Sequence, residues 1–355
     1  MKNVKVILTG VALCATLFAA NQRINALGGD SGFWPNDRDN INYFPSTIND
    51  HAFVEVDGVG SAGGDTTATG ESNDITATVL FGDDTKWGFS YDKADSDSWF
   101  NIMWGSGDMG IKGGLISSSE DADAEGNSGF NFAYGQNFSW GELGVGLVSG
   151  AHDADGAFNN DQMDYWLNWR GDLGFWIFDQ SKASLMMTDD GADHTTMDLG
   201  FDMFTHMDAG GADVLFGMGV GYTSNSNAGT WDDDDDAGTV EVAYDATSTV
   251  LTLPSATVAV EADITDWATF RCFVNTDYTI SSSLEDDDSQ TSYAADGYTG
   301  ASSSFGMGLG FNWGGLTADM NVSENLLQDP ISYMTGFNGD DNTLTNYGVT
   351  LTYSF

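Results

Sequence analysis

The last residues of the chain, 345–355, read TNYGVTLTYSF and alternate between two kinds of side chain. Every second residue from Tyr347 to Phe355 is apolar or aromatic, and small or polar residues stand between them. Because successive side chains of a β-strand point to opposite faces, this stretch predicts a strand with one apolar and one polar face. Such a strand fits a soluble sandwich or a membrane barrel, so the rest of the chain must decide between them.

The chain begins with a segment typical of secretory signals. Two lysines in a short basic head precede an apolar run over residues 6–20, which is too short to span a bilayer. We predict that residues 1–26 are a signal peptide cleaved after Ala26, with cleavage after Ala19 or Ala20 as the alternatives. Cys272 is then the only cysteine of the mature chain, so an intramolecular disulfide is excluded.

The composition favours an ordered, acidic β-protein. The chain has 10 Lys and Arg against 54 Asp and Glu, and removal of residues 1–26 leaves 7 against 54. Such a charge repels nucleic acid and anionic membrane surfaces. The 13% aromatic content, 45 Gly and 4 Pro favour strands with many tight turns over disorder. The mature chain has no long apolar run for a transmembrane helix, so a β-barrel is the only membrane-spanning structure open to it.

Strand-like alternation recurs along the mature chain. The connections alternate between short turns such as GSGD and long acidic loops such as EDADAEGN, which is typical of a barrel with short periplasmic turns and long outer loops. Fourteen and eighteen strands are the alternatives to the sixteen that we predict, and residues 239–252 are expected to form a separate hairpin above the membrane. The predicted strands cover residues 51–59, 73–82, 85–93, 98–105, 109–118, 128–138, 141–149, 161–170, 173–188, 194–206, 212–224, 255–263, 267–280, 302–313, 315–325 and 345–355.

The predicted outward faces are uncharged. Trp87, Phe89 and Tyr91 share one such face, and the terminal Phe355 resembles the signal that outer-membrane assembly machinery reads. We therefore predict an all-β protein, a transmembrane antiparallel up-and-down β-barrel over residues 51–355 in the bacterial outer membrane. Its expected partners are membrane lipid and lipopolysaccharide, the barrel assembly machinery through the last strand, and small solutes.

Residues 27–50, LGGDSGFWPNDRDNINYFPSTIND, precede the first predicted strand. This stretch resembles the N-terminal hatch of outer-membrane long-chain fatty-acid and aromatic-hydrocarbon transporters, in which a Gly-rich opening precedes an acidic-Asn patch and an aromatic-Asn-Pro motif. VEADITDWATFRCFV is similar to a late hairpin of the same barrels, with Glu261, Trp267 and Arg271 at the patterned positions. The resemblance implies a short periplasmic or lumenal hatch over residues 27–50 and makes transport of hydrophobic compounds a candidate function.

The predicted lumen is charged and mainly acidic. Nine acids and four bases fall on the inward faces, which favours a water-filled, cation-preferring pore. The four bases either neutralise inward acids or set a transverse field across the pore, and both roles can hold together. The predicted pore-lining residues are Asp74, Lys86, Asp92, Lys112, Asp164, Arg170, Asp198, Asp202, Glu261, Asp263, Arg271, Asp277 and Asp319.

The function that follows is passive diffusion of small hydrophilic, cationic solutes through a porin-like channel. The first alternative is a transporter of hydrophobic compounds, whose apolar pocket would come from the hatch residues Phe33, Trp34, Tyr43 and Phe44. The second alternative is a non-transporting surface anchor or adhesin. The oligomeric state stays open.

We expect no enzymatic activity and no cofactor. The four histidines have no Ser or Cys partner at a catalytic spacing. Asp121, Asp123 and Glu125 occupy positions one, three and five of a calcium loop, but Phe132 stands at position twelve, where a bidentate Glu belongs. The sequence therefore supports loosely bound Ca²⁺ at most, and no nucleic-acid partner.

Overall fold

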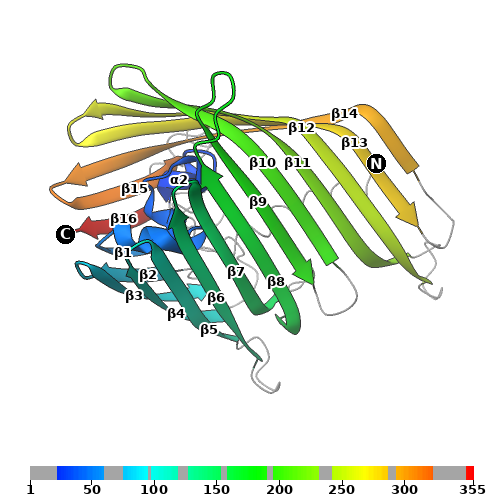
Figure 1. The fold of residues 1–355 in the computed structure, drawn as a ribbon, viewed down its shortest axis with the longest axis horizontal. Coiled ribbons are helices and arrows are strands. Elements are labelled where there is room, and N and C mark those ends of the chain that lie inside the picture. The colour runs from blue at the N-terminus through cyan, green and yellow to red at the C-terminus, as the bar shows by residue number, and fades with distance from the viewer. Residues whose placement is uncertain are drawn as a thin grey trace, which may run out of the picture.

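The computed structural model describes residues 22–59, 75–94, 97–118, 127–152, 158–189, 195–231, 242–286, 293–322 and 349–355 of the 355-residue chain. Sixteen strands pair antiparallel, each with its neighbours in the sequence, and β1 closes the ring by pairing with β16 (Figure 1). The prediction of an all-β, closed, up-and-down barrel of sixteen strands is therefore confirmed.

The strands differ in length around the barrel. Those from β11 to β14 are the longest, while β1, β2, β15 and β16 are short. The bounds are β1 Phe53–Val59, β2 Ile75–Phe81, β3 Thr85–Ala94, β4 Asp97–Ser106, β5 Met109–Ser118, β6 Asn127–Phe138, β7 Gly141–His152, β8 Phe158–Gly171, β9 Gln180–Asp189, β10 Thr195–Asp208, β11 Ala212–Trp231, β12 Val242–Thr265, β13 Ala268–Asp286, β14 Tyr293–Trp313, β15 Leu316–Val322 and β16 Val349–Ser354.

Two of the predicted elements are wrong: the separate hairpin over residues 239–252 and the start of the strand predicted from residue 173. Residues 242–252 do not form a separate hairpin, because β12 runs through them and pairs with β11 and β13. Pro254 lies within this strand where the register shifts between Thr252 and Ser255, a place where a sheet tolerates proline. The strand predicted from residue 173 begins at Gln180 instead, and the apolar residues before it form a turn.

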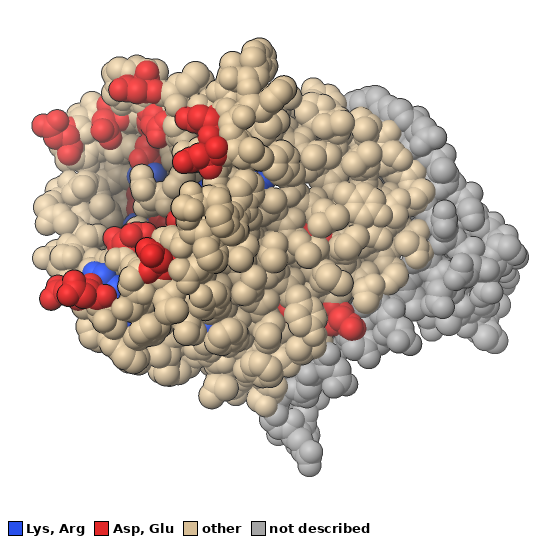
Figure 2. All heavy atoms as spheres, in the orientation of Figure 1, with Lys and Arg blue, Asp and Glu red and all other residues tan. Residues whose placement is uncertain are grey.

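The outer wall is apolar, as a lipid-facing surface must be. Large side chains are exposed all along it, and on the face shown in Figure 2 the wall is almost free of charge, while acidic side chains gather at the end with the short turns. A closed barrel pairs all of its backbone groups between strands, which is the condition for crossing hydrocarbon without helices. The protein is an outer-membrane β-barrel in contact with membrane lipid. Examples of exposed wall residues are Phe89, Phe100, Leu115, Tyr165, Val274 and Phe305.

The helices of the described residues all precede β1. They are α2 (Gln22–Asn25), η2 (Ser31–Phe33), η3 (Arg38–Asn42) and η4 (Pro45–Asp50). Within the described ranges, no helix has the length and apolar character that a membrane-spanning helix requires. These helices lie inside the barrel near the end that carries the short turns, shown in blue in Figure 1. We call residues 22–50 the plug.

Candidate functional site

The plug is a chain of short turns that its own side chains hold together. The Asp30 carboxylate accepts a hydrogen bond from the Gly32 amide at 2.8 Å, and Asp37 accepts one from the Asp39 amide at the same distance. The buried Asn40 amide donates to the main-chain oxygens of Trp34 (2.7 Å) and Asp37 (3.0 Å). Carboxylates and amides that cap their own backbone explain why an Asp- and Asn-rich segment forms turns here and not a strand.

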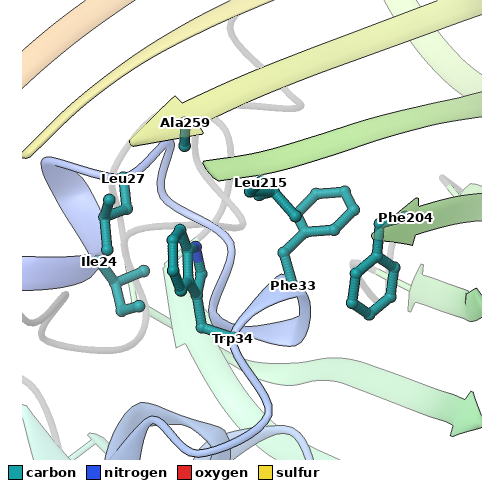
Figure 3. Close-up of a cluster of buried hydrophobic side chains, with 7 residues drawn as sticks. All are labelled: Ile24, Leu27, Phe33, Trp34, Phe204, Leu215 and Ala259. Carbon is teal, nitrogen blue, oxygen red and sulfur yellow. The ribbon is translucent and has the colours of Figure 1, made fainter. Parts of the chain in front are cut away.

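An apolar cluster fixes the first half of the plug against the barrel wall (Figure 3). The Phe33 ring meets the Phe204 ring edge-on, with a centroid distance of 5.2 Å. A second cluster fixes the other half, where Ile41 and Ile48 pack against strands β1, β2 and β4. The first cluster consists of Ile24, Leu27, Phe33, Trp34, Phe204, Leu215 and Ala259, and the wall residues of the second are Phe53, Leu80 and Met103.

Inward-facing glycines make room for the plug backbone. A Cβ atom on Gly110 of β5 would lie 1.8 Å from the Pro45 carbonyl oxygen, and one on Gly144 of β7 would lie 1.9 Å from that of Tyr43. On β6, a Cβ on Gly135 would lie 2.3 Å from the Ser46 nitrogen. Real Cβ contacts are not this short, so only glycine lets the wall and the plug approach so closely. We call Gly110, Gly135 and Gly144 the glycine cradle.

Arg170 of β8 is a buried cation that binds the plug directly. Its Nη1 donates to the main-chain oxygen of Gly32 at 3.0 Å and to Asn40 Oδ1 at 3.2 Å. Its Nε and Nη2 donate to the Glu142 carboxylate, and the guanidinium lies 4.6 Å from the centroid of the Phe44 ring. The planar guanidinium thus uses its several donors and its face at once, which a lysine could not do.

A second network joins the plug to strands β12, β13 and β15. Arg271 donates to Glu261 at 3.0 Å and to Asp319 at 2.7 Å. Arg23 of the plug pairs with the same Glu261 at 2.9 Å and also with Asp37. Glu261 and Arg271 lie on consecutive strands, whereas Asp319 and the plug residues Arg23 and Asp37 are distant in the sequence, so the folded barrel and its plug together assemble the network.

Two more cations complete the attachment. Lys182 of β9 bridges Asp30 of the plug (2.6 Å) and Asp202 of β10 (2.9 Å). Arg38 of the plug pairs with Glu55 of β1. Buried charges are stable only when they are paired, and in these networks each cation has at least one carboxylate partner.

A cavity of about 90 Å³, lined by both polar and apolar side chains, remains between the plug and strands β1 to β8. Four carboxylates line it, from Asp39, Glu55, Asp57 and Asp92, against two bases. Both bases already have partners: Arg38 forms an ion pair with Glu55, and the Lys112 ammonium donates a hydrogen bond to Asn42 Oδ1 at 2.6 Å. The remaining lining includes Thr76, Thr78, Ser90, Asn101, Asn131, Trp99 and Trp166.

A larger cavity of about 850 Å³ opens between the plug and the last residues of the chain. Trp34, His51, His206 and Asp213 line it, together with the terminal Phe355. His206 Nε2 lies 2.7 Å from the main-chain oxygen of Phe33, and its Nδ1 lies 3.0 Å from Asp213. Burial lowers the pKa of His51, and for the plug residue Asp39 burial and the neighbouring Asp37 and Glu55 carboxylates raise the pKa.

The structure brings part of the predicted pore lining to the plug and places the rest elsewhere on the wall. Arg170, Arg271, Glu261, Asp202 and Asp319 bind the plug or its partners, as described above. Asp92 and Lys112 line the small cavity. Three of the other acids accept hydrogen bonds from neighbouring side chains: the buried Asp164 from Gln162, Asp198 from Thr223 and Asp263 from Thr269. Asp277 is exposed on β13, and Lys86 donates a hydrogen bond to the Gly82 carbonyl. Asp74 lies outside the described residues.

The aromatic hatch residues face the wall. Phe33, Trp34 and Phe44 are buried, and Tyr43 sits at the glycine cradle. The calcium candidates Asp121, Asp123 and Glu125 lie outside the described residues. Across the ranges that the structure describes, no group of three or more His, Cys, Asp and Glu side chains is arranged to hold a metal ion.

Three functional residues were not predicted from the sequence. Arg23 lies inside the predicted signal peptide, Arg38 lies in the hatch, and Lys182 follows the turn that was taken for a strand. The parity of β9 could have placed Lys182 inward, because Leu185 and Met187 on the same strand carry the apolar face.

The end of the barrel with the short turns carries many exposed acids. The exposed acids on these turns and the adjoining strand ends are Asp83, Asp84, Asp108, Asp172, Asp179, Asp208, Asp213, Asp263 and Asp266.

No family model and no curated protein matches this chain. Among solved structures, it is similar to a bacterial polysaccharide outer membrane secretin, with a TM-score of 0.48, 11% identity and coverage of 85% of this chain and 97% of the other. It is also similar to the translocator domain of the autotransporter NalP from Neisseria meningitidis (TM-score 0.28, 13% identity, coverage 86% and 87%) and to BamA from Haemophilus ducreyi (0.34, 9%, 86% and 70%). At these scores the similarities carry no argument about function, and the barrel assignment rests on the strand pairing and the apolar wall.

Proposed function

We propose that this outer-membrane barrel is a channel for passive diffusion of small hydrophilic, cationic solutes, with the plug narrowing its path. The observation that carries the proposal is the small cavity beside the plug. Its four carboxylates against two bases, together with the hydroxyl and amide groups in its lining, suit a hydrated cation or a small amine better than an apolar molecule. Trp99 and Trp166 add aromatic surfaces, which attract cations through the ring quadrupole.

The charges outside the cavity support the same choice of solute. The exposed acids on the short turns surround the periplasmic mouth, and the inward bases Arg170, Lys182 and Arg271 are held in ion pairs with carboxylates of the wall or the plug. A field of one sign between low-dielectric walls concentrates counter-ions. Cations would therefore be enriched at the mouth and at the cavity.

Transport of hydrophobic compounds is the second candidate, and the feature that favours it is the occupied lumen. A passive channel does not need a plug, and the resemblance of residues 27–50 to the hatch of fatty-acid transporters supports such a role. Against it, Phe33 and Phe44 are buried against the wall, and the larger cavity that Trp34 borders is also lined by charged residues such as Arg23 and Asp213. The passive channel therefore stays our first proposal.

A selectivity measurement on two matched variants tests the proposal. Asp92→Asn removes a cavity carboxylate, and Asp83→Asn removes a carboxylate from an exposed turn at the mouth. A unit charge 4 Å away is worth about 1 kcal/mol in bulk water, so we expect Asp92→Asn to lower the cation-to-anion permeability ratio about fivefold. Screening acts over about 10 Å at 0.1 M salt and about 3 Å at 1 M, so the effect of Asp83→Asn should vanish at 1 M KCl while that of Asp92→Asn persists.

Two results would count against the proposal. Equal effects of the two variants at 1 M KCl would remove the cavity from the permeation path. A folded protein without conductance, which nevertheless takes up a labelled fatty acid in vesicles, would favour the hydrophobic transporter.

A further inference from the structure

The turn between β8 and β9 differs from every other short turn that the structure describes. It spans residues 172–179, DLGFWIFD, and exposes four large apolar side chains. Leu173 is 57% exposed, Phe175 69%, Trp176 82% and Ile177 46%. Trp176 has a φ of 59°, in the left-handed region that is uncommon for non-glycine residues, and Phe175 and Phe178 pair across the bend. We call residues 172–179 the apolar hairpin.

The apolar hairpin folds onto the outside of the barrel. Phe178 is buried and stacks on Phe216 of β11, with a centroid distance of 5.6 Å and an interplanar angle of 14°. Phe216 faces outward, because its neighbour Leu215 packs with the plug and a Cβ on Gly217 would meet the Phe33 ring at 3.2 Å. The hairpin therefore crosses the outer faces of β9 and β10, which lie between β8 and β11 in the sheet.

Two polar residues on the wall bear out this placement. Ser181 and Thr205 point outward, since their neighbours Lys182 and Phe204 face the plug, yet both are buried. The Ser181 hydroxyl donates to the main-chain oxygen of Leu173 at 2.6 Å. Thr205 lies opposite Phe216 in the strand register. The hairpin covers polar groups on the part of the wall that would otherwise meet hydrocarbon.

The position along the wall fixes the environment of the hairpin. Phe216 is the fifth residue of β11, which begins at Ala212. At about 3.3 Å per residue, Phe216 lies roughly 13 Å along the strand from its start. The ring that stacks on it therefore lies beside the lipid-facing wall, and the acids Asp172 and Asp179 mark the two ends of the hairpin nearest the strands.

We propose that the apolar hairpin inserts into the periplasmic leaflet of the outer membrane as an interfacial anchor. The molecule that covers the hairpin is lipid, because the surface of the hairpin continues the exposed apolar surface of the wall. It also joins the exposed aromatic residues at the same end, which include Trp140, Trp267 and Trp313. Tryptophan and phenylalanine favour the boundary between headgroups and acyl chains. A contiguous exposed apolar surface of this kind marks an interaction site in a folded protein.

Site-directed spin labelling in proteoliposomes tests this proposal. In a Cys272→Ser background, labels are placed by Trp176→Cys in the hairpin, by Leu167→Cys on the outward face of β8, and by Asp83→Cys on another short turn. Oxygen partitions into the bilayer, whereas a water-soluble nickel chelate does not. We expect the oxygen-to-nickel accessibility ratio at position 176 to resemble that at position 167 and to exceed that at position 83 several-fold.

Two outcomes would overturn the anchor. If the label at position 176 is as accessible to nickel as the label at position 83, the hairpin projects into the aqueous periplasm. If it is shielded from both reagents, protein covers the hairpin, and a contact with a second copy takes the place of lipid. The labels at positions 167 and 83 show in each preparation that the barrel has folded and inserted.

Discussion

Arg170 donates a 3.0 Å hydrogen bond from Nη1 to the main-chain oxygen of Gly32, although 138 residues separate the two in the sequence. The contact joins the short-turn end of β8 to the plug. The acceptor is a main-chain oxygen, so the hydrogen bond depends on where the plug backbone runs and not on a side chain of the plug. The plug is therefore a docked part of the lumen, and removal of its anchors should release it.

The first prediction concerns Arg170. Arg170→Gln should leave the half-buried Glu142 without its cation and should remove two hydrogen bonds to the plug, and because Glu142 is partly solvated the cost should fall below the about 3–5 kcal/mol of a fully buried pair. We expect the barrel to fold while the plug becomes sensitive to protease added to the folded protein. Lys86→Gln is the control, because it removes the same charge from a lysine that bonds only to the Gly82 carbonyl among the contacts described. Equal protease resistance of both variants would show that Arg170 does not hold the plug.

The second prediction concerns the glycine cradle. Gly110→Ala should displace the plug, because the new Cβ would lie 1.8 Å from the Pro45 oxygen. Gly113→Ala is the matched control on the same strand, since its nearest contact would be an ordinary 3.5 Å. We expect higher single-channel conductance and a protease-sensitive plug in Gly110→Ala alone. A cradle variant that keeps wild-type conductance and protection would mean that the wall adjusts around the added methyl group.

The third prediction concerns the start of the mature chain. Signal cleavage after Ala26 would remove Arg23 and Ile24, yet Arg23 pairs with Asp37 and Glu261, and Ile24 is buried in the apolar cluster. These contacts favour the alternative cleavage after Ala19 or Ala20. Intact-mass measurement of the protein purified from outer membranes should therefore find a chain that still contains Arg23. A chain beginning at Leu27 would contradict this and would require the plug to dock without α2.

The fourth prediction concerns pH. Burial and the Asp37 and Glu55 carboxylates raise the pKa of Asp39, so the docked plug binds a proton at this site more tightly than the released plug does. Docking should therefore weaken as the pH rises from the ordinary Asp range, near 4, through the raised pKa of Asp39, by about 1.4 kcal/mol for each pH unit of the shift.

The variant Asp39→Asn tests the predicted direction of this pH dependence. It should increase protection of the plug from protease at pH 7, and the difference from wild type should disappear below about pH 4, where Asp39 is protonated in both states. Asp50→Asn serves as the control, because Asp50 is an exposed carboxylate of the same plug. A destabilised plug in Asp39→Asn at pH 7 would show that the ionised carboxylate is needed for docking.

The barrel could be predicted from the sequence because strand alternation is a local signal. The residues of each strand indicate by themselves which side chains face lipid and which face the lumen. In the last strand Leu351 is exposed and Thr350 is buried, as the alternation predicts. The predictions failed where local signals conflict. Pro254 lies within a strand that the sheet continues, and the apolar run from Leu173 to Phe178 looked like a strand although Trp176 turns the backbone there.

The plug contacts could not be predicted in the same way, because they depend on how far apart distant segments lie. Nothing near Arg170 in the sequence points to Gly32, and Arg23 was assigned to the signal. One signal was present: glycines at inward positions of neighbouring strands, such as Gly110, Gly135 and Gly144, indicate that another backbone approaches the wall closely.

The most direct test of the proposed channel is the reversal potential of the wild-type protein in a planar bilayer, measured across a threefold KCl gradient with the low-salt side at 1 M. At that salt the mouth charges are screened over about 3 Å, so selectivity reports the charges along the path. We predict a reversal potential of the sign that potassium preference gives, and a larger conductance with the same sign after deletion of residues 22–50. A reversal potential of the sign that chloride preference gives would contradict the cation channel.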